Sequence, residues 1–296
     1  MMPAETEADM RIEKGSLRGG LPGLALALAL AVLSWGCTNP QDRTPDDVED
    51  AGVPPDLWAR PRPDFAEPRD LALPDVHVVI TADNAYAFGW GFADRVTKLN
   101  GRPKTVVAGD IFNCPLGVGP EAYDIPSLDA PESSYLYIVA WADDAVTQGV
   151  IGQFDRGTNP IYTGSGDWEV CATGLPYAAD AAGGGPPIAV VNQEILRCND
   201  GLGDPGKTSA GWVNTAGAVT KNAIGSLAVG EDNSMSGGDF PIVCQKDPMG
   251  QRGVDAAARW MWYSPNGQPP FRHMGGVNPT RAFLIFRLPS RVIVIG

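Results

Sequence analysis

The stretch that decides the fold is Ser134–Trp141, which reads SYLYIVAW. Most of its residues are aromatic or β-branched, and such side chains fit the pleated, half-buried surface of a sheet. Turn-forming residues bound the run, with Pro131 before it and the pair Asp143-Asp144 after it. The sequence therefore predicts a β-strand here, the strongest in the chain.

Shorter runs of the same character lie on both sides of this strand. They are His77–Ala82, Tyr86–Trp90, Thr105–Val107, Tyr123–Ile125, Val146–Phe154, Trp168–Ala172, Arg259–Tyr263, Ala282–Leu288 and Val292–Ile295. Turn signals separate them, as at Asp155-Arg156-Gly157. Many short strands with turns between them are typical of a β-sandwich or jelly roll and not of alternating βαβ units. We expect an all-β domain over residues 76–296.

One long segment interrupts the strand pattern. Residues 173–250 are rich in Gly, Asn and Asp, and their clear apolar run is Ile188–Ile195. We interpret the segment as an insert between strands. The only helix candidate in the domain is Gly253–Arg259, about two turns long.

Composition agrees with a turn-rich, acidic domain. Hydrophobic residues make up 44% of the 296 residues, enough for a substantial core, and 36 Gly and 27 Pro favour turns over long helices. The formal net charge is −13. Because such a surface repels phosphate backbones, we expect no nucleic-acid partner.

The N-terminus has the organisation of a signal peptide over residues 1–36. Its apolar run Leu21–Leu33, LPGLALALALAVL, has 13 residues, whereas a bilayer span needs about 20. Basic residues precede this run, namely Arg11, Lys14 and Arg18. A basic region, a short apolar region and a small residue before the cleavage point together predict export.

The end of this segment, Leu33–Cys37 or LSWGC, resembles the lipobox of bacterial lipoproteins. The resemblance implies that cleavage exposes Cys37, which then carries the lipid and anchors the chain in a membrane. Thr38 follows the cysteine, and the lack of Asp at this place implies retention in the outer membrane or at the cell surface. We therefore expect an extracytoplasmic protein.

Residues 37–75 differ from everything around them. Pro recurs every few residues, Asp and Glu lie between, and no period of 2 or 3.6 persists. Such a segment buries too little apolar area to offset the entropy of ordering it. We expect a disordered, extended tether between the lipid and the domain.

The pattern of the domain resembles galactose-binding-like β-sandwiches. The matching runs, in order, are Ile80–Tyr86, Tyr135–Asp144, Gly149–Phe154, Gly164–Val170, Ala258–Trp262 and Ala282–Pro289. The resemblance implies a jelly-roll sandwich that binds a ligand. Phe88–Gly91 stands where many members have a turn, and Asn100-Gly101, the strongest hairpin dipeptide, is expected to supply that turn instead.

The remaining cysteines fit two disulfides in an exported chain. They are Cys114, Cys171, Cys198 and Cys244, an even number that allows three pairings. We favour Cys114–Cys171 with Cys198–Cys244, because the second bond would staple the long insert. No C-x-x-C motif is present, so we expect no metal site made of these cysteines.

Gly201–Thr208, GLGDPGKT, fits the phosphate-binding pattern G-x-x-x-x-G-K-T. That motif needs a strand before it and a helix after it, and the residues after Thr208 are a poor helix start. We interpret it as a surface turn and expect no nucleotide. Two clusters of oxygen-bearing residues are compatible with a structural Ca²⁺ ion, and we expect no other cofactor. They are Asn199-Asp200-Gly201 with Asp204, and Glu231-Asp232-Asn233 with Asp239.

Catalytic patterns are weak. The only histidines are His77 and His273, and no G-x-S-x-G elbow accompanies them. Asp143 and Asp144 are adjacent, and adjacent residues of a strand point to opposite faces, so they do not make a facing glycosidase pair. We expect no enzymatic activity.

Aromatic residues outside the core offer a better route to function, because exposed rings stack on sugar faces. Trp90, between Gly89 and Gly91, and Trp212 are the candidates. Asp83 and Asn84, in the run Ile80–Tyr86, are the polar candidates. The sequence thus predicts a surface binding module for carbohydrate or another extracellular ligand. A structural or assembly protein of the envelope or coat is the alternative, and a hydrolase comes third.

Overall fold

We analysed a computed structural model of the whole chain. It describes residues 73–83, 85–101, 112, 119–141, 147–176, 185–203, 208–234, 238–245, 253–272 and 282–294. All of them belong to one unit, Ala66–Gly296. The predicted signal peptide, Cys37 and nearly all of the predicted tether lie outside the described residues.

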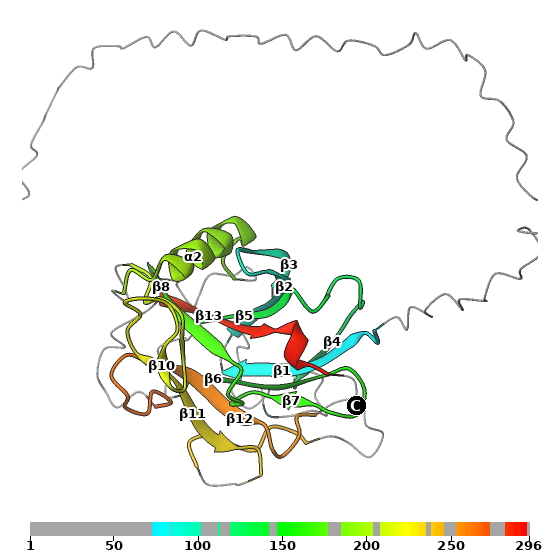
Figure 1. Cartoon of the computed structure of the whole chain (residues 1–296). Helices are drawn as coiled ribbons and strands as arrows, with labels where there is room; N and C mark the ends of the chain where they lie inside the picture. The colour runs from blue at the N-terminus through cyan, green and yellow to red at the C-terminus, as the bar shows by residue number, and fades with distance from the viewer. Residues whose placement is uncertain are drawn as a thin grey trace, which may run out of the picture. The chain divides into compact units, whose positions relative to one another are not determined.

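The described part of the chain forms two antiparallel sheets (Figure 1). Sheet A has the order β11-β12-β6-β1-β4, with β7 also paired to β6. Its strands are β1 (Val76–Asp83), β4 (Glu121–Ile125), β6 (Gly149–Asp155), β7 (Ile161–Tyr162), β11 (Ser226–Asp232) and β12 (Arg259–Ser264). Sheet B has the order β10-β9-β8-β13-β5-β2-β3. Its strands are β2 (Ala85–Phe92), β3 (Arg95–Gly101), β5 (Tyr135–Trp141), β8 (Glu169–Pro176), β9 (Val213–Asn214), β10 (Gly217–Ala218) and β13 (Ala282–Pro289).

The two sheets pack face to face around one apolar core. Phe88 of sheet B lies against Phe154 of sheet A, with ring centroids 6.4 Å apart. Trp262 of sheet A and Phe286 of sheet B are 6.0 Å apart. Buried aromatic pairs of this kind stabilise a core beyond their burial alone. The all-β sandwich predicted from the strand pattern is therefore confirmed at this level, and the galactose-binding-like type stays a prediction.

Most predicted strands are present with small shifts of their ends, including Ser134–Trp141 as β5 in the middle of sheet B. Five strands of the described part were missed, namely β3, β7, β9, β10 and β11. The expected tail strand Val292–Ile295 is wrong for its described part, because Ser290–Val292 forms a short 3-10 helix, η3. Thr105–Val107 lies outside the described residues.

The hairpin expected at Asn100-Gly101 is also wrong. Both residues lie in β3, where Asn100 pairs with Phe88 and Gly101 pairs with Ala87. The chain turns earlier, between Phe92 and Arg95, which face each other across the hairpin. Two residues suffice for such a turn, and their sequence, Ala93-Asp94, has the aspartate but not the glycine that would have signalled it.

The helix prediction failed in both directions. Gly253–Arg259 forms no helix, and the apolar run at Ile188 opens the helix α2 (Ile188–Asp200). Its β-branched residues favour a strand locally, but Val191, Ile195 and Cys198 all lie on one face and are buried. Tertiary packing therefore overrides the local preference.

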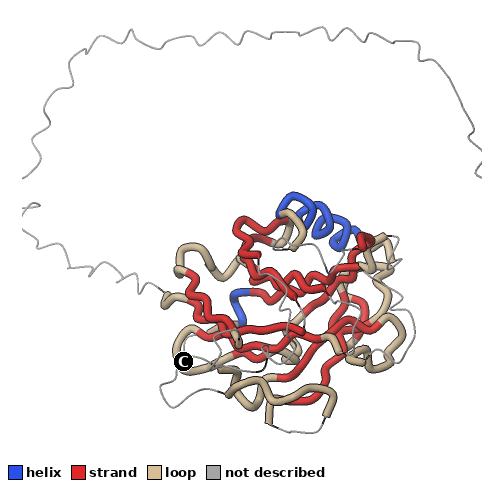
Figure 2. Tube along the Cα trace, turned by 180° about the vertical axis from the view of Figure 1, so that it is seen from behind, coloured by secondary structure: helices blue, strands red, loops and turns tan. Residues whose placement is uncertain are grey.

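Additional chain covers the outer face of sheet B, where α2 lies over the strands (Figures 1 and 2). Its buried side chains join a second apolar cluster with residues of the sheet. Those residues are Ala85, Ala87, Val96, Tyr137, Val139, Trp141, Cys171, Phe283 and Ile285. The sandwich thus buries both faces of sheet B, one against sheet A and one beneath α2.

The part of the insert after β11 also folds back onto the domain. Asn233 donates from Nδ2 to the carbonyls of Val243 and Val254, and its Oδ1 accepts from the N–H of Val243. Phe240 stacks on Trp260 of β12 at a centroid distance of 3.9 Å. These contacts fix residues 238–245 against sheet A.

Candidate functional site

The outer face of sheet B carries a row of polar and aromatic side chains beside α2. In an antiparallel sheet, residues directly opposite each other on neighbouring strands share a face. Arg287 of β13 faces Glu169 of β8 on one side and Tyr137 of β5 on the other. Tyr135 lies two residues before Tyr137 and so points to the same face.

Arg287 is the centre of this row, and its guanidinium is almost completely buried. Nε donates to Glu169 Oε2 at 2.6 Å, and Nη1 donates to Asn199 Oδ1 at 3.2 Å. The guanidinium also lies 3.9 Å from the ring centroid of Trp212 and 5.1 Å from that of Tyr135. We call Tyr135, Glu169, Asn199, Trp212 and Arg287 the Arg287 cluster.

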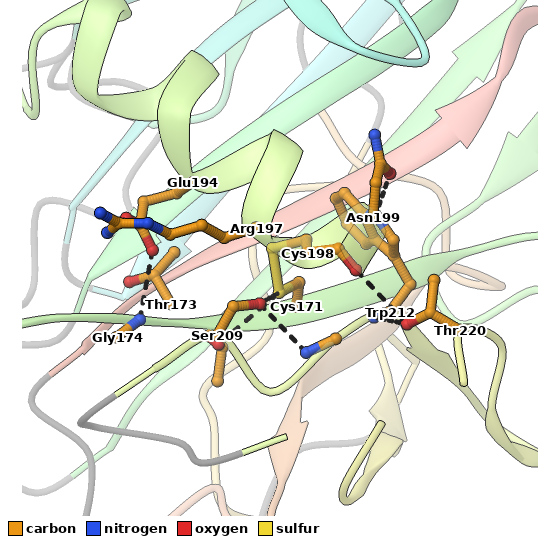
Figure 3. Close-up of a disulfide and its surroundings, with 12 residues drawn as sticks. Cys171, Thr173, Gly174, Glu194, Arg197, Cys198, Asn199, Ser209, Trp212 and Thr220 are labelled. Atoms are coloured by element: carbon orange, nitrogen blue, oxygen red, sulfur yellow. Dashed lines mark hydrogen bonds and ion pairs between the residues drawn. A yellow bond between two sulfur atoms is a disulfide. The ribbon is translucent and has the colours of Figure 1, made fainter. Parts of the chain in front are cut away.

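The end of α2 completes the cluster (Figure 3). Asn199 accepts from Trp212 Nε1 at 2.7 Å and donates from Nδ2 to the carbonyl of Ala93 at 3.0 Å. The backbone N–H of Trp212 donates to Thr220 Oγ1 at 2.8 Å. The asparagine therefore joins the helix, the β2–β3 hairpin and the cluster.

The cluster reaches solvent on the side of the β2–β3 hairpin. Tyr135 is half-buried, and Phe92 at the tip of β2 is 41% exposed. Tyr135 pairs with Gly91, the residue before Phe92, and Tyr137 pairs with Gly89. The hydroxyl of Tyr137 donates to the carbonyl of Phe92 at 2.5 Å. Arg95 lies 5.5 Å from the centroid of Phe92. The rings of Tyr135 and Phe92 can each stack on a ligand, and the Tyr135 hydroxyl and the exposed Arg95 guanidinium can donate hydrogen bonds to it.

A signal for this cluster was present in the sequence. Arg287 interrupts the apolar run Ala282–Leu288, AFLIFRL, and a charged residue inside a buried strand needs a partner. The partners Glu169 and Asn199 come from distant parts of the chain, so the sequence did not identify them.

Neither tryptophan proposed for ligand binding exposes its ring. Trp212 is 0% exposed, beneath Arg287. Trp90 is 4% exposed and belongs to β2, where its flanking glycines form part of the strand and not of a loop. The expectation of exposed rings is therefore wrong for both. The neighbouring glycines suggested exposed loops. Instead, Trp212 packs in the cluster beneath α2, and Trp90 packs in the core between the two sheets.

The polar candidates have mixed outcomes. Asp83 lies at the end of β1 and is buried, and its Oδ2 accepts from Thr147 Oγ1 at 2.5 Å. Asn84 lies outside the described residues. Asp83 is far along the chain from every residue of the Arg287 cluster, and the strand that carries it belongs to sheet A.

The favoured disulfide pairing is wrong. Cys171 of β8 is bonded to Cys198 of α2, across 27 residues. Cys244 is also disulfide-bonded, and Cys198 is already used. Cys114 lies outside the described residues. Order along the chain misled the prediction, because α2 folds back across β8 and brings Cys198 to it.

In the second calcium cluster, the carboxylates of Glu231 and Asp232 accept hydrogen bonds from within the protein. Glu231 accepts from the N–H groups of Asp239 and Phe240, and Asp232 accepts from Ser234, which lowers the pKa of Asp232. Asp204 and His273 lie outside the described residues. Within the described ranges, no group of three or more His, Cys, Asp or Glu side chains could hold a metal ion.

The phosphate-loop pattern has the wrong surroundings. Gly201 does not follow a strand but ends α2 in the left-handed conformation, and the next element is the strand β9. His77 pairs with Asp124 at 2.8 Å, and both side chains are exposed, so this surface pair contributes little. No helix within the described part of the chain is both long and apolar enough to cross a bilayer.

Burial protects several tyrosines of the sandwich from ionisation. It raises the pKa of Tyr86 well above the ordinary value, and the carboxylate of Glu121, 2.6 Å from the hydroxyl, raises it further. Burial likewise raises the pKa values of Tyr137, Tyr162 and Tyr263. Each of these phenols keeps its proton in the folded state at a pH where the unfolded chain loses it.

We therefore expect stability to fall at alkaline pH. It should be fully present below about pH 10, the tyrosine value in the unfolded chain, and decline as pH rises toward the folded values. Each deeply buried tyrosine (Tyr86, Tyr137 and Tyr263) contributes a slope of about 1.4 kcal/mol per pH unit in that window. Urea unfolding at several alkaline pH values measures this slope, and Tyr86→Phe should reduce it by one such increment. An equal slope in Tyr86→Phe would contradict the assignment.

Comparison with known proteins gives no relative: no family model matches the chain, and no curated protein and no solved structure matches it either.

Proposed function

We propose that this chain is an exported, lipid-anchored binding protein whose β-sandwich recognises a carbohydrate or another extracellular ligand without catalysis. The observation that carries the proposal is the disulfide between Cys171 and Cys198, both fully buried. Structural disulfides of this kind belong to oxidising compartments outside the cytoplasm. The signal-peptide pattern and the lipobox-like Leu33–Cys37 agree with this location.

The Arg287 cluster supports binding over catalysis. Its carboxylate, Glu169, is ion-paired to Arg287, and the cluster holds no histidine, cysteine or serine. The half-buried ring of Tyr135 and the exposed ring of Phe92, the second with Arg95 beside it, instead offer stacking and hydrogen bonding to a planar or ring-shaped ligand. The galactose-binding-like pattern of six sequence runs remains part of this proposal.

A glycan array with the full-length chain tests it. We expect wild type to bind a defined set of glycans. Tyr135→Ala and Phe92→Ala should each weaken binding about ten-fold, because one stacked ring contributes about 1–2 kcal/mol. Leu128→Ala is the matched control, since Leu128 is 92% exposed in the turn after β4 and should bind as wild type does.

Two outcomes would contradict the proposal. Binding to no glycan would favour an envelope structural protein, and unchanged binding by Tyr135→Ala would move the ligand away from the Arg287 cluster. Cys37→Ala tests the lipid anchor independently of the binding face. This variant should leave the membrane fraction and keep its glycan specificity.

A further inference from the structure

The helix α2 has little tendency to form by itself. It has 13 residues, and isolated helices below about 12–15 residues are marginal in water. Pro187 precedes it without a side-chain cap, and its first turn holds no acidic residue. Four of its residues are β-branched, which lowers helix propensity: Ile188, Val190, Val191 and Ile195. Its structure therefore depends on docking against sheet B.

The docking surface of α2 is small and partly polar. Its buried residues are Val191, Glu194, Ile195 and Cys198. Glu194 is a fully buried carboxylate that accepts from the N–H of Gly174 at 3.3 Å and pairs with Arg197 (Figure 3). Burial of a charge is unfavourable unless every such partner is in place.

The other non-covalent attachments of α2 are hydrogen bonds. Asn199, at the end of the helix, bonds to Ala93, Trp212 and Arg287 as described above, and Asn192 bonds to the edge of sheet B. Asn192 accepts from the N–H of Val96 at 2.7 Å and donates to the carbonyl of the same residue at 3.1 Å. The amide thereby takes the place of a neighbouring strand. These bonds stabilise little in net terms, because water replaces them when the helix opens.

The remaining attachment is covalent. Cys198, on the buried face of α2, is bonded to Cys171 in β8. Cross-linking two sites 27 residues apart favours the closed arrangement by a factor on the order of a few hundred. Because α2 is a weak helix that buries only two aliphatic side chains, Val191 and Ile195, a factor of this size in the docking equilibrium decides whether the helix docks.

We propose that α2 is a redox-dependent cover: it docks on sheet B when the Cys171–Cys198 bond forms, and the reduced chain exposes the apolar face beneath it. That face includes Val139, Trp141 and Phe283. When the bond forms, the thiols of Cys171 and Cys198 give two electrons and two protons to a disulfide oxidant, which is thereby reduced to two thiols. Reduction by a thiol or phosphine reverses it. The inference does not depend on the ligand proposed above.

Hydrogen exchange on Cys171→Ala/Cys198→Ala tests this in the full-length chain, because the double variant leaves the bond of Cys244 intact. We expect protection of the amides of 188–200 to fall on the order of a hundred-fold or more. Amides of β1, β5 and β6 should keep their protection. Trypsin should then cleave after Arg197, which is half-buried in α2.

The matched control is Ser209→Ala, which removes a buried hydroxyl 3.1 Å from Cys171 Sγ and leaves the bond intact. It should keep α2 protected. Unchanged protection of 188–200 in the double cysteine variant would overturn the proposal. Loss of protection throughout both sheets would also overturn it, since α2 would then be an integral part of the core and not a separable cover.

Discussion

Trp212→Ala is expected to lower the free energy of unfolding by about 3–5 kcal/mol. The ring is 0% exposed and lies under the guanidinium of Arg287 at 3.9 Å. Its removal leaves a cavity on the outer face of sheet B and deprives Asn199 Oδ1 of the N–H that it accepts at 2.7 Å. Cavity and lost contact act in the same direction.

Urea unfolding followed by tryptophan fluorescence and circular dichroism measures this change. Trp212→Phe keeps an aromatic ring beneath Arg287 but not the N–H donor, so its loss should be smaller, about 1–2 kcal/mol. Leu128→Ala, on the exposed turn after β4, should stay within about 0.5 kcal/mol of wild type. A Trp212→Ala protein of normal stability that loses only ligand binding would show that the ring serves recognition and not packing.

Arg156→Met is expected to be destabilising by about 2–4 kcal/mol. Arg156 follows β6 and is only 2% exposed. Its Nη1 donates to the carbonyl of Pro74 at 2.9 Å, and its Nη2 donates to the carbonyl of Ala130. Burial lowers the pKa of the guanidinium, while Glu132 and Asp75 act in the opposite direction. Methionine fills similar space but leaves both carbonyls without this donor.

Arg156 joins the start of the domain, at Pro74, to the turn that contains Ala130. Asp75 also contacts this turn, because it accepts from the N–H of Ser127 at 2.8 Å. Arg95→Met is the matched control, because Arg95 is exposed and its ion pair with Asp94 contributes at most about 1 kcal/mol. Equal unfolding midpoints for the two variants would mean that the bonds of Arg156 carry no net stability.

The strands were predictable because their signal is local. In β5 the aromatic and β-branched residues of Ser134–Trp141 favour an extended backbone wherever the strand is placed. The same local reasoning did not find α2, because the β-branched residues of the apolar run Ile188–Ile195 lower helix propensity. The helical arrangement becomes the better one through tertiary contacts, which include the packing of Val191 and Ile195 on sheet B and the bond of Cys198 to Cys171.

The candidate site was less predictable than the strands. Trp212 and Arg287 are 75 residues apart (287 − 212), and a position in the sequence does not reveal what will cover it. Asn199 was considered as a calcium ligand, yet its amide serves Trp212, Arg287 and Ala93. The cysteine count allowed three pairings, and only the path of α2 across β8 selected Cys171–Cys198.

By itself the sequence determined that this chain is built from short strands, because strand propensity and turn residues are local properties. The export signal at the N-terminus stays a prediction from the local order of charged and apolar segments. The tertiary structure decided which side chains are buried, which cysteines meet and which residues form the Arg287 cluster. These depend on contacts between residues far apart in the chain, and their free energies appear only when the two sheets and α2 come together.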